Sequence, residues 1–135
     1  MIQKEVDRLA NGKCEYCHCL QKYTPEKHEF EHIIPIIQGG KSVTLNLARA
    51  CRGCKNLKSI SIAGIDPETQ EITPLFNPRK DRWHEHFSWS NDKILLIGRT
   101  PKGRATINRL KLNRKELKNI RRITIDFGHP PPLGS

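Results

Sequence analysis

The 135-residue sequence is poor in the residues that build a large hydrophobic core. Only 36% of its residues are apolar and 6% are aromatic, and it holds a single methionine. Soluble domains are typically about 45–50% apolar. Because a thin core contributes little stability to a chain of this length, we expect a second source of stability, such as a bound metal ion.

Long hydrophobic runs are also missing. A helix that spans a membrane needs about 20 consecutive apolar residues, and no run in this sequence approaches that length. The N-terminal stretch MIQKEVDRLANG carries charges where a signal peptide would have its apolar segment. We therefore expect a cytoplasmic protein without a membrane partner.

Negative charge is scarce relative to positive charge. The chain has 24 lysines and arginines against 14 acidic residues, which gives a net charge of +10 and a pI near 9.7. Nine basic residues and a single acid, Glu116, lie between Lys102 and Arg122. This balance favours a polyanionic partner such as DNA, although a solvated helix face is the alternative explanation of the charge run.

The five cysteines form two close pairs with one residue left over. In a reducing compartment such cysteines are metal ligands before they are disulfides. Cys14 and Cys17 make one CxxC, Cys51 and Cys54 make the other, and Cys19 is spare. Four thiolates complete the tetrahedron that Zn²⁺ prefers and leave no open position for water, so the pattern predicts a structural zinc. Unliganded or disulfide-paired cysteines are the alternative.

The periodicity of the first half predicts short elements around these cysteines. Apolar residues at helical spacing predict a helix over residues 2–10. The β-forming stretch HEFEHII predicts a strand over 28–34, and QGGKS predicts a turn over 38–42. A segment without glycine or proline predicts a helix that begins after Cys54.

The second half is predicted to hold a hairpin, a strand and a helix. Prolines leave no room for long elements over residues 66–78, and DPETQEITP predicts a turn with a short hairpin, with a loop as the alternative. The apolar run KILLIG predicts a strand over 93–98, followed by a turn over 100–104. Asn113 and Glu116 have the spacing of a capping box that opens a basic helix over 114–122.

The residues between the two cysteine pairs resemble a known family. FEHIIPIIQGG is followed by LNLARACRGCKNLKS, so that an acid-histidine pair at a strand end precedes a proline, a double glycine, an Asn-Leu and a CxxC that leads into a helix. This order resembles the zinc-bearing, cysteine-clamped HNH endonucleases of bacteria over residues 14–59. The later stretches LFNPRKDRWHEHFSW and GRTPKGRATINRLKLNR also resemble bacterial members.

The resemblance implies an α+β fold. Its centre would be a ββα-metal hairpin-helix core over about residues 28–62, clamped by the four-cysteine zinc. A C-terminal strand and basic helices would follow in an extension over about 73–125. We expect a single domain over 1–129, a disordered tail over 130–135, and a monomer or weak dimer.

The resemblance also implies roles for individual residues. His32 matches the general base, Asn46 the residue that orients it, and Glu31 an acid that ligates the catalytic metal. Lys55 stands where the family has its final metal ligand, usually His or Asn. Because an ammonium group donates hydrogen bonds and accepts none, it cannot ligate a cation, and Asn56 is the possible substitute.

The implied activity is hydrolysis of DNA phosphodiester bonds with Mg²⁺, Mn²⁺ or another divalent ion, weakened or abolished by Lys55. An inactive zinc-containing DNA-binding module of the same fold is the alternative, and a structural zinc domain that binds protein or RNA is a third possibility. The residues expected to contact DNA are Lys58, Arg104, Arg109, Arg114, Lys118 and Arg121.

Overall fold

The computed structural model describes residues 2–128 and divides them into two compact units. Unit 1 holds the described residues up to Ile62 together with Asn77–Lys80, and unit 2 holds Ala63–Phe76 and the described residues from Asp81 onward. The tail over 130–135 lies outside the described residues. The prediction of one domain over 1–129 stays a prediction.

Unit 1 begins with helix α1 (Ile2–Ala10), as predicted from its apolar spacing. The helix buries Val6 and Ala10 and contacts strand β2 (Leu47–Ala50). It ends where Asn11 and Gly12 take positive φ angles of 53° and 76°, a conformation that asparagine and glycine tolerate best. The chain then turns through the first cysteine pair and the 3-10 helix η1 (Gln21–Tyr23).

A two-stranded antiparallel hairpin forms the centre of unit 1. Strand β1 (Glu29–His32) pairs with β2 (Leu47–Ala50), and the 3-10 helices η2 (Ile36–Gln38) and η3 (Thr44–Asn46) lie in the loop between them. Strand β1 is shorter than the predicted 28–34, because the Asn46 side chain binds both the N–H and the carbonyl of Ile34 in place of a strand partner.

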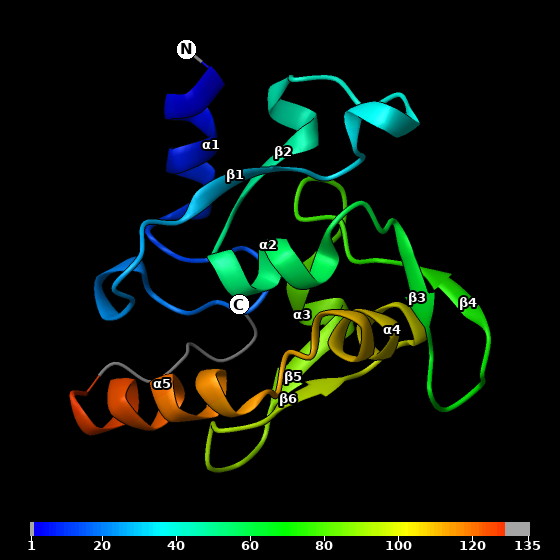
Figure 1. Ribbon diagram of the computed structural model, residues 1–135. Coiled ribbons are helices and arrows are strands. Elements are labelled where there is room, and N and C mark those ends of the chain that lie inside the picture. The colour runs from blue at the N-terminus through cyan, green and yellow to red at the C-terminus, as the bar shows by residue number, and fades with distance from the viewer. Residues whose placement is uncertain (1, 129–135) are drawn as a thin grey trace. The chain divides into compact units, whose positions relative to one another are not determined.

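Helix α2 (Arg52–Lys58) follows β2 directly and contacts both strands, which completes a ββα arrangement (Figure 1). It begins earlier than predicted, before Cys54, because the Cys51 sulfur accepts a hydrogen bond from the Cys54 N–H and caps the helix. The mixed α and β fold class, with small antiparallel sheets, is confirmed.

Unit 2 contains two further hairpins and three helices. The hairpin predicted within 66–78 is only partly right: the turn and the second strand lie in that range, but the first strand, Ala63–Ile65, precedes it. The expected strand over 93–98 is reduced to its last residues. The elements in chain order are β3 (Ala63–Ile65), β4 (Ile72–Pro74), α3 (Trp83–His86), β5 (Phe87–Trp89), β6 (Leu96–Gly98), α4 (Pro101–Leu110) and α5 (Lys115–Asp126).

Two predictions for unit 2 are wrong at helix starts. The expected turn over 100–104 is the first turn of α4, where the Thr100 hydroxyl accepts from the Gly103 N–H at 3.1 Å and caps the helix. Asn113 does not cap α5, because its side-chain oxygen accepts from the Leu96 N–H and from Arg121. Gly103 is required in α4, since a Cβ there would lie 2.1 Å from the His86 carbonyl oxygen.

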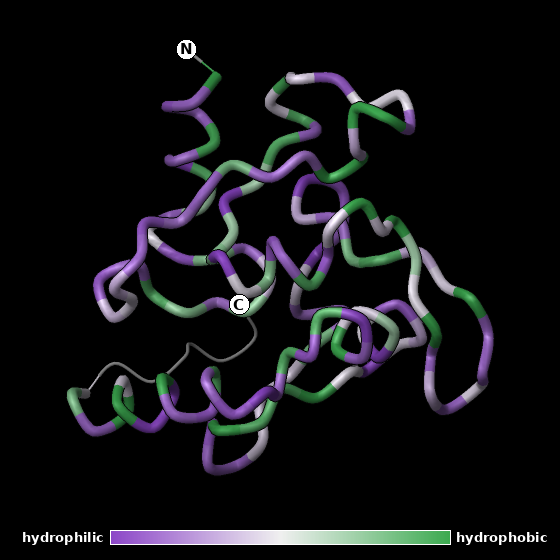
Figure 2. The backbone as a smooth tube through the Cα atoms, in the orientation of Figure 1, coloured by the Kyte–Doolittle hydropathy of each residue, from purple (hydrophilic) through white to green (hydrophobic). Residues whose placement is uncertain are grey.

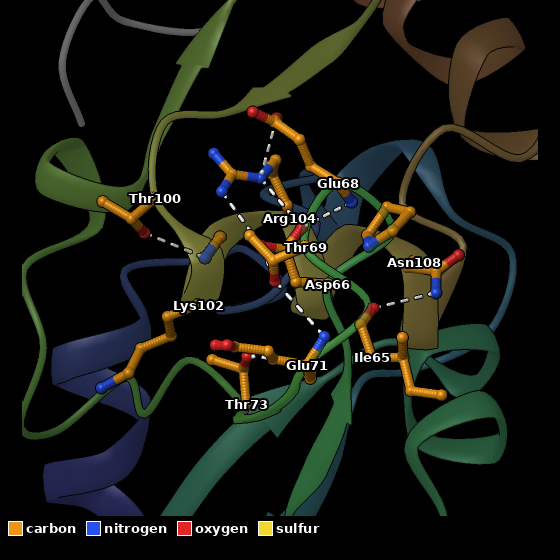
Figure 3. Close-up of polar contacts among 12 residues, drawn as sticks. Ile65, Asp66, Glu68, Thr69, Glu71, Thr73, Thr100, Lys102, Arg104 and Asn108 are labelled. Atoms are coloured by element: carbon orange, nitrogen blue, oxygen red, sulfur yellow. Dashed lines mark hydrogen bonds and ion pairs between the residues drawn. The ribbon is translucent and has the colours of Figure 1, made fainter.

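A buried ion pair fastens the β3–β4 turn to α4 (Figure 3). Arg104 donates to both carboxylate oxygens of the fully buried Asp66 at 2.9 Å. Asp66 also accepts from the Glu68 N–H and the Thr69 hydroxyl. The hydrogen bonds from Arg104, the largest of these effects, hold the pKa of Asp66 well below its usual range.

Replacement of Arg104 by methionine should therefore flatten the acid dependence of unit 2 stability. A carboxyl whose pKa is depressed by folding adds stability above its unfolded pKa of about 3.9, and this stability is lost as the pH falls toward the native pKa. Urea unfolding at pH 6, 4 and 3 should show a steeper loss in the parent than in the Arg104→Met protein. Parallel losses in the two proteins would contradict the assignment.

Hydrophobic and hydrophilic residues alternate in short stretches along the whole described chain, with no long hydrophobic run (Figure 2). Among residues 2–128, no helix combines the length and the apolar character needed to cross a membrane. The apolar contacts are thus spread over two small cores, and in unit 1 the buried cysteines form part of that core.

Candidate active site and metal centre

The four predicted zinc ligands meet in one buried cluster of unit 1. The sulfur atoms of Cys14, Cys17, Cys51 and Cys54 all lie within 4.8 Å of one another. In each pair the second cysteine's backbone N–H donates to the first cysteine's sulfur at 3.5 Å. These are the donor set and the geometry of a tetrahedral site, and they fit Zn²⁺.

The protonation of the cluster also favours a divalent cation. Burial opposes ionisation of Cys14, but thiol hydrogen bonds from Cys17 and Cys19 bring its pKa well below the ordinary value. The same burial raises the pKa of Cys17. Burial thus opposes a cluster of four thiolates without a counter-charge. A divalent ion supplies the positive charge that lets all four be thiolates.

Cys19 lies beside this cluster and outside the set of four. Its sulfur is 3.2 Å from the Cys17 sulfur and 3.9 Å from the Nε2 atom of His28. The residue is buried, at 7% exposure. Its position agrees with the interpretation of Cys19 as a neighbour of the zinc site.

His32 ends strand β1, next to the loop that joins the two strands. Its Nε2 atom pairs with the Ser42 hydroxyl at 2.8 Å, and its ring is half-buried. This partner of the predicted base had no signal in the sequence, because a serine in a turn is common. The contact fixes one ring nitrogen and leaves the ring edge near solvent.

Asn46 acts on the loop backbone. Its side-chain oxygen accepts from the Ile34 N–H at 2.8 Å, and its amide donates to the carbonyls of Ile34 and Lys41 at 2.9 Å. Gly40 completes this packing, since a Cβ there would lie 1.7 Å from the Ile34 oxygen. Asn46 therefore fixes the loop that follows His32, and the role predicted for it in orienting the base stays a prediction.

Glu31 points to the opposite side of β1 from His32, as neighbouring residues of a strand do. It is 8% exposed, and its Oε2 atom has no hydrogen-bond partner among the described residues. Burial raises the pKa of Glu31, while the ammonium groups of Lys58 and Lys55 act against this. A buried carboxylate oxygen of this kind fits the requirement for one metal ligand.

Lys55 and Lys58 bind the outer edge of β1. The Lys55 ammonium donates to the Phe30 carbonyl at 2.8 Å and lies 3.5 Å from Glu29. The buried Lys58 donates to the carbonyls of His32 and Ile33 at 3.3 and 3.0 Å. Both lysines thus supply donors to a strand edge that has no third strand beside it.

A second ligand for a catalytic ion is not provided by these residues. Lys55 cannot coordinate a cation, and Asn56 is exposed one position further along α2, a rotation of about 100°. Among the described residues, the four cysteines are the only group of three or more His, Cys, Asp or Glu side chains that could hold a metal. The donor set around Glu31 therefore does not fit a complete catalytic metal site.

Several residues predicted to contact DNA make contacts within their own unit. Lys58 is buried under β1, and Arg104 is paired with Asp66. Arg121 is 5% exposed and donates to Leu112 and Ile94 carbonyls. Arg114 also donates to the Leu110 carbonyl at 3.0 Å. The other two predicted contacts, Arg109 and Lys118, are partly accessible.

An ion pair that the sequence did not reveal supports the first cysteine pair. Glu15 lies between the two cysteines, is 7% exposed, and accepts from Arg79 at 2.7 Å. It also accepts from the Arg49 N–H in β2 at 2.9 Å. The segment Asn77–Lys80 belongs to unit 1 for this reason, although it is distant in sequence.

Known proteins resemble the part of the chain that holds this site. Residues 14–59 match a family model described as HNH endonuclease. The Septu protein PtuB of Bacillus thuringiensis is 30% identical over 114 residues, which cover 83% of this chain and 41% of that protein. The chain thus spans about two fifths of the length of this relative. No solved structure matches the chain significantly.

Proposed function

We propose that this chain cleaves DNA by hydrolysing phosphodiester bonds, because its residues 14–59 match the HNH endonuclease family. His32 would be the general base. The observation that carries this proposal is the position of His32 at the end of β1, with one ring nitrogen on Ser42 and the following loop held by Asn46.

In this reaction His32 takes a proton from a water molecule. The resulting hydroxide forms a bond to phosphorus, the bond to the leaving oxygen breaks, and that oxygen is protonated from solvent. Imidazole suits the first step because its unperturbed pKa of about 6.5 lies near neutral pH. The Ser42 contact at 2.8 Å restrains the ring so that the other nitrogen can face the water.

HNH nucleases generally use a divalent metal, which stabilises negative charge on the phosphate. We propose Mg²⁺ or Mn²⁺ for this role, with Glu31 as a ligand. Lys55 stands where the resemblance to HNH nucleases expects the second ligand, and its ammonium is held on the Phe30 carbonyl. We therefore further propose that the chain is weakly active as it stands. The inactive zinc-containing DNA-binding module is the second candidate, and Lys55 is the observation that favours it.

An assay with supercoiled plasmid tests the proposal. The purified chain, with its zinc content measured first, is incubated with Mg²⁺, with Mn²⁺ or with excess EDTA. Nicked or linear product that depends on the added ion supports the nuclease. Binding without product under all three conditions supports the inactive module.

Replacement of His32 by alanine should abolish cleavage while zinc content and DNA binding persist. The loss should be roughly 10²–10⁴-fold, the usual contribution of a general base. The Ser42→Ala protein is the matched control, since it removes the partner and keeps the imidazole. If the His32→Ala protein loses zinc or its fold, His32 is structural and the assignment fails.

A further inference from the structure

An open cleft of about 710 Å³ lies in unit 1 beside the start of the hairpin. Its walls come from α1, the residues that lead into β1, the first half of β1, strand β2 and the first turn of α2. Neither the family match nor the predicted site residues assign a ligand to it. The charged and aromatic residues of the wall are Asp7, Lys27, Glu29, Phe30, Arg49, Arg52 and Lys55.

The cleft wall carries four cationic side chains and two acidic ones. Asp7 pairs with Arg49 at 2.5 Å, and Glu29 lies 3.5 Å from both Arg52 and Lys55. Arg52 also lies 3.0 Å from Glu26, which is outside the wall. Positive charge therefore exceeds negative charge within the wall, and Lys27 is exposed at its rim.

The ion pairs of Arg52 are of the kind that a phosphate can replace. The Arg52 side chain is 58% exposed and its partners Glu26 and Glu29 are 51% and 40% exposed. Exposed pairs contribute only about 0–1 kcal/mol. A guanidinium binds phosphate through two parallel hydrogen bonds, which are stronger and more directional.

The cleft and the candidate active site share one residue. Lys55 lines the cleft, and the proposed function assigns it to the position of the second metal ligand. Phe30, also in the wall, precedes His32 by two residues of strand, which is about 6.6 Å. A nucleic-acid strand whose scissile phosphate lies at His32 would therefore pass the cleft.

We propose that this cleft binds the sugar-phosphate backbone of a nucleic-acid strand next to the scissile phosphate, with Lys27 and Arg52 as its phosphate contacts. The inference rests on the proposed function for the placement of the scissile phosphate. Phosphate recognition by these two side chains can be measured without cleavage.

The test is the salt dependence of binding, measured by fluorescence anisotropy with a single-stranded DNA and an RNA of the same sequence, about 12 nucleotides long. The buffer contains no added Mg²⁺ or Mn²⁺. The protein with Lys27→Ala and Arg52→Ala should bind about tenfold or more weakly. Its slope of log affinity against log salt should be smaller by about 1.4, because each phosphate that is no longer neutralised reduces the slope by about 0.7.

The matched control replaces Lys22 and Lys80 by alanine. Both are exposed lysines of unit 1 outside the cleft wall, and their removal subtracts the same charge. The control should keep the parent slope. If the two double variants lose the same affinity and slope, the proposal for the cleft is wrong, because the overall positive charge of the protein would then account for the binding. If the Arg52→Ala substitution reduces the zinc content, the binding measurement is repeated with the Lys27→Ala protein alone.

The plasmid assay separates this inference from the proposed function. If the parent chain never cleaves the plasmid but the double variant at Lys27 and Arg52 binds more weakly than the parent, the proposed cleft stands and the proposed nuclease activity fails. If the parent chain cleaves and the double variant binds as tightly as the parent, the nuclease activity stands and the proposed cleft fails. A larger loss of affinity with RNA than with DNA would identify RNA as the bound strand.

Discussion

Replacement of Lys55 by asparagine is expected to raise plasmid cleavage in Mg²⁺ or Mn²⁺ by about 10²–10⁴-fold. The Lys55 ammonium donates to the Phe30 carbonyl and lies close enough to Glu31 to influence its pKa. In the proposed function, this ammonium places a positive charge where a second metal ligand is needed. Asparagine would supply a neutral oxygen beside the buried Glu31 carboxylate, and several kcal/mol of transition-state stabilisation would follow from the bound ion.

Metal binding must be measured as well as cleavage. Electron paramagnetic resonance of Mn²⁺ should show tighter binding to the Lys55→Asn protein than to the parent at equal zinc content. Lys55→Met is the control, since it removes the charge without providing a ligand. If the Lys55→Met protein binds Mn²⁺ and cleaves plasmid as well as the Lys55→Asn protein does, removal of the positive charge explains the whole effect. A parent that already cleaves as fast as the Asn variant would place Lys55 outside the catalytic site.

The parts of the fold that the sequence predicted are those determined by local pattern. Cysteine spacing identified the four residues whose sulfur atoms meet within 4.8 Å. The apolar spacing of the N-terminal stretch predicted α1, and the β-forming stretch around His32 predicted β1. Each of these signals lies within a few residues or has a fixed spacing, so tertiary contacts were not needed to recognise it.

The parts that were missed depend on contacts between distant residues. Asn113 has the spacing of a helix cap, but Leu96 and Arg121 occupy its oxygen, and both interactions come from outside its own turn. Arg121 and Arg104 belong to a basic run that reads as a DNA contact surface. In the folded chain they hold carbonyls and the buried Asp66. Charge in a sequence does not distinguish a surface contact from an internal one.

The two lysines of α2 show the same limit within the site. The resemblance assigns Lys55 to a metal-ligand position and Lys58 to contact with DNA. Both ammonium groups bind carbonyls of β1, those of Phe30 and His32, because a hairpin of two strands leaves one edge of β1 without a partner. A sequence pattern gives the residue type at each position. It does not show which strand carbonyls lack a partner, because that is known only once the order of the strands in the sheet is known.

Removal of zinc is expected to unfold unit 1. All five cysteines belong to this unit, and the cluster of four joins the segment before β1 to the start of α2. A four-thiolate site contributes on the order of 10 kcal/mol, which is as large as the whole stability of many domains. With Val6, Ala48 and Ala50 among the few other fully buried apolar residues, the remaining core is too small to replace it.

The aromatic residues allow each unit to be followed separately. Both tryptophans, Trp83 and Trp89, lie in unit 2, whereas Tyr16 and Tyr23 lie in unit 1. Chelation of zinc should abolish the near-ultraviolet dichroism of Tyr16, which is 1% exposed, together with the hydrogen-exchange protection of β1 and β2. Cys54→Ser should have the same effect, whereas Cys19→Ser should keep about one zinc per chain, because Cys19 lies outside the set of four. Persistence of the tyrosine signal and of strand protection after complete chelation would show that hydrophobic packing alone maintains unit 1, and that the cysteine cluster is dispensable for its fold.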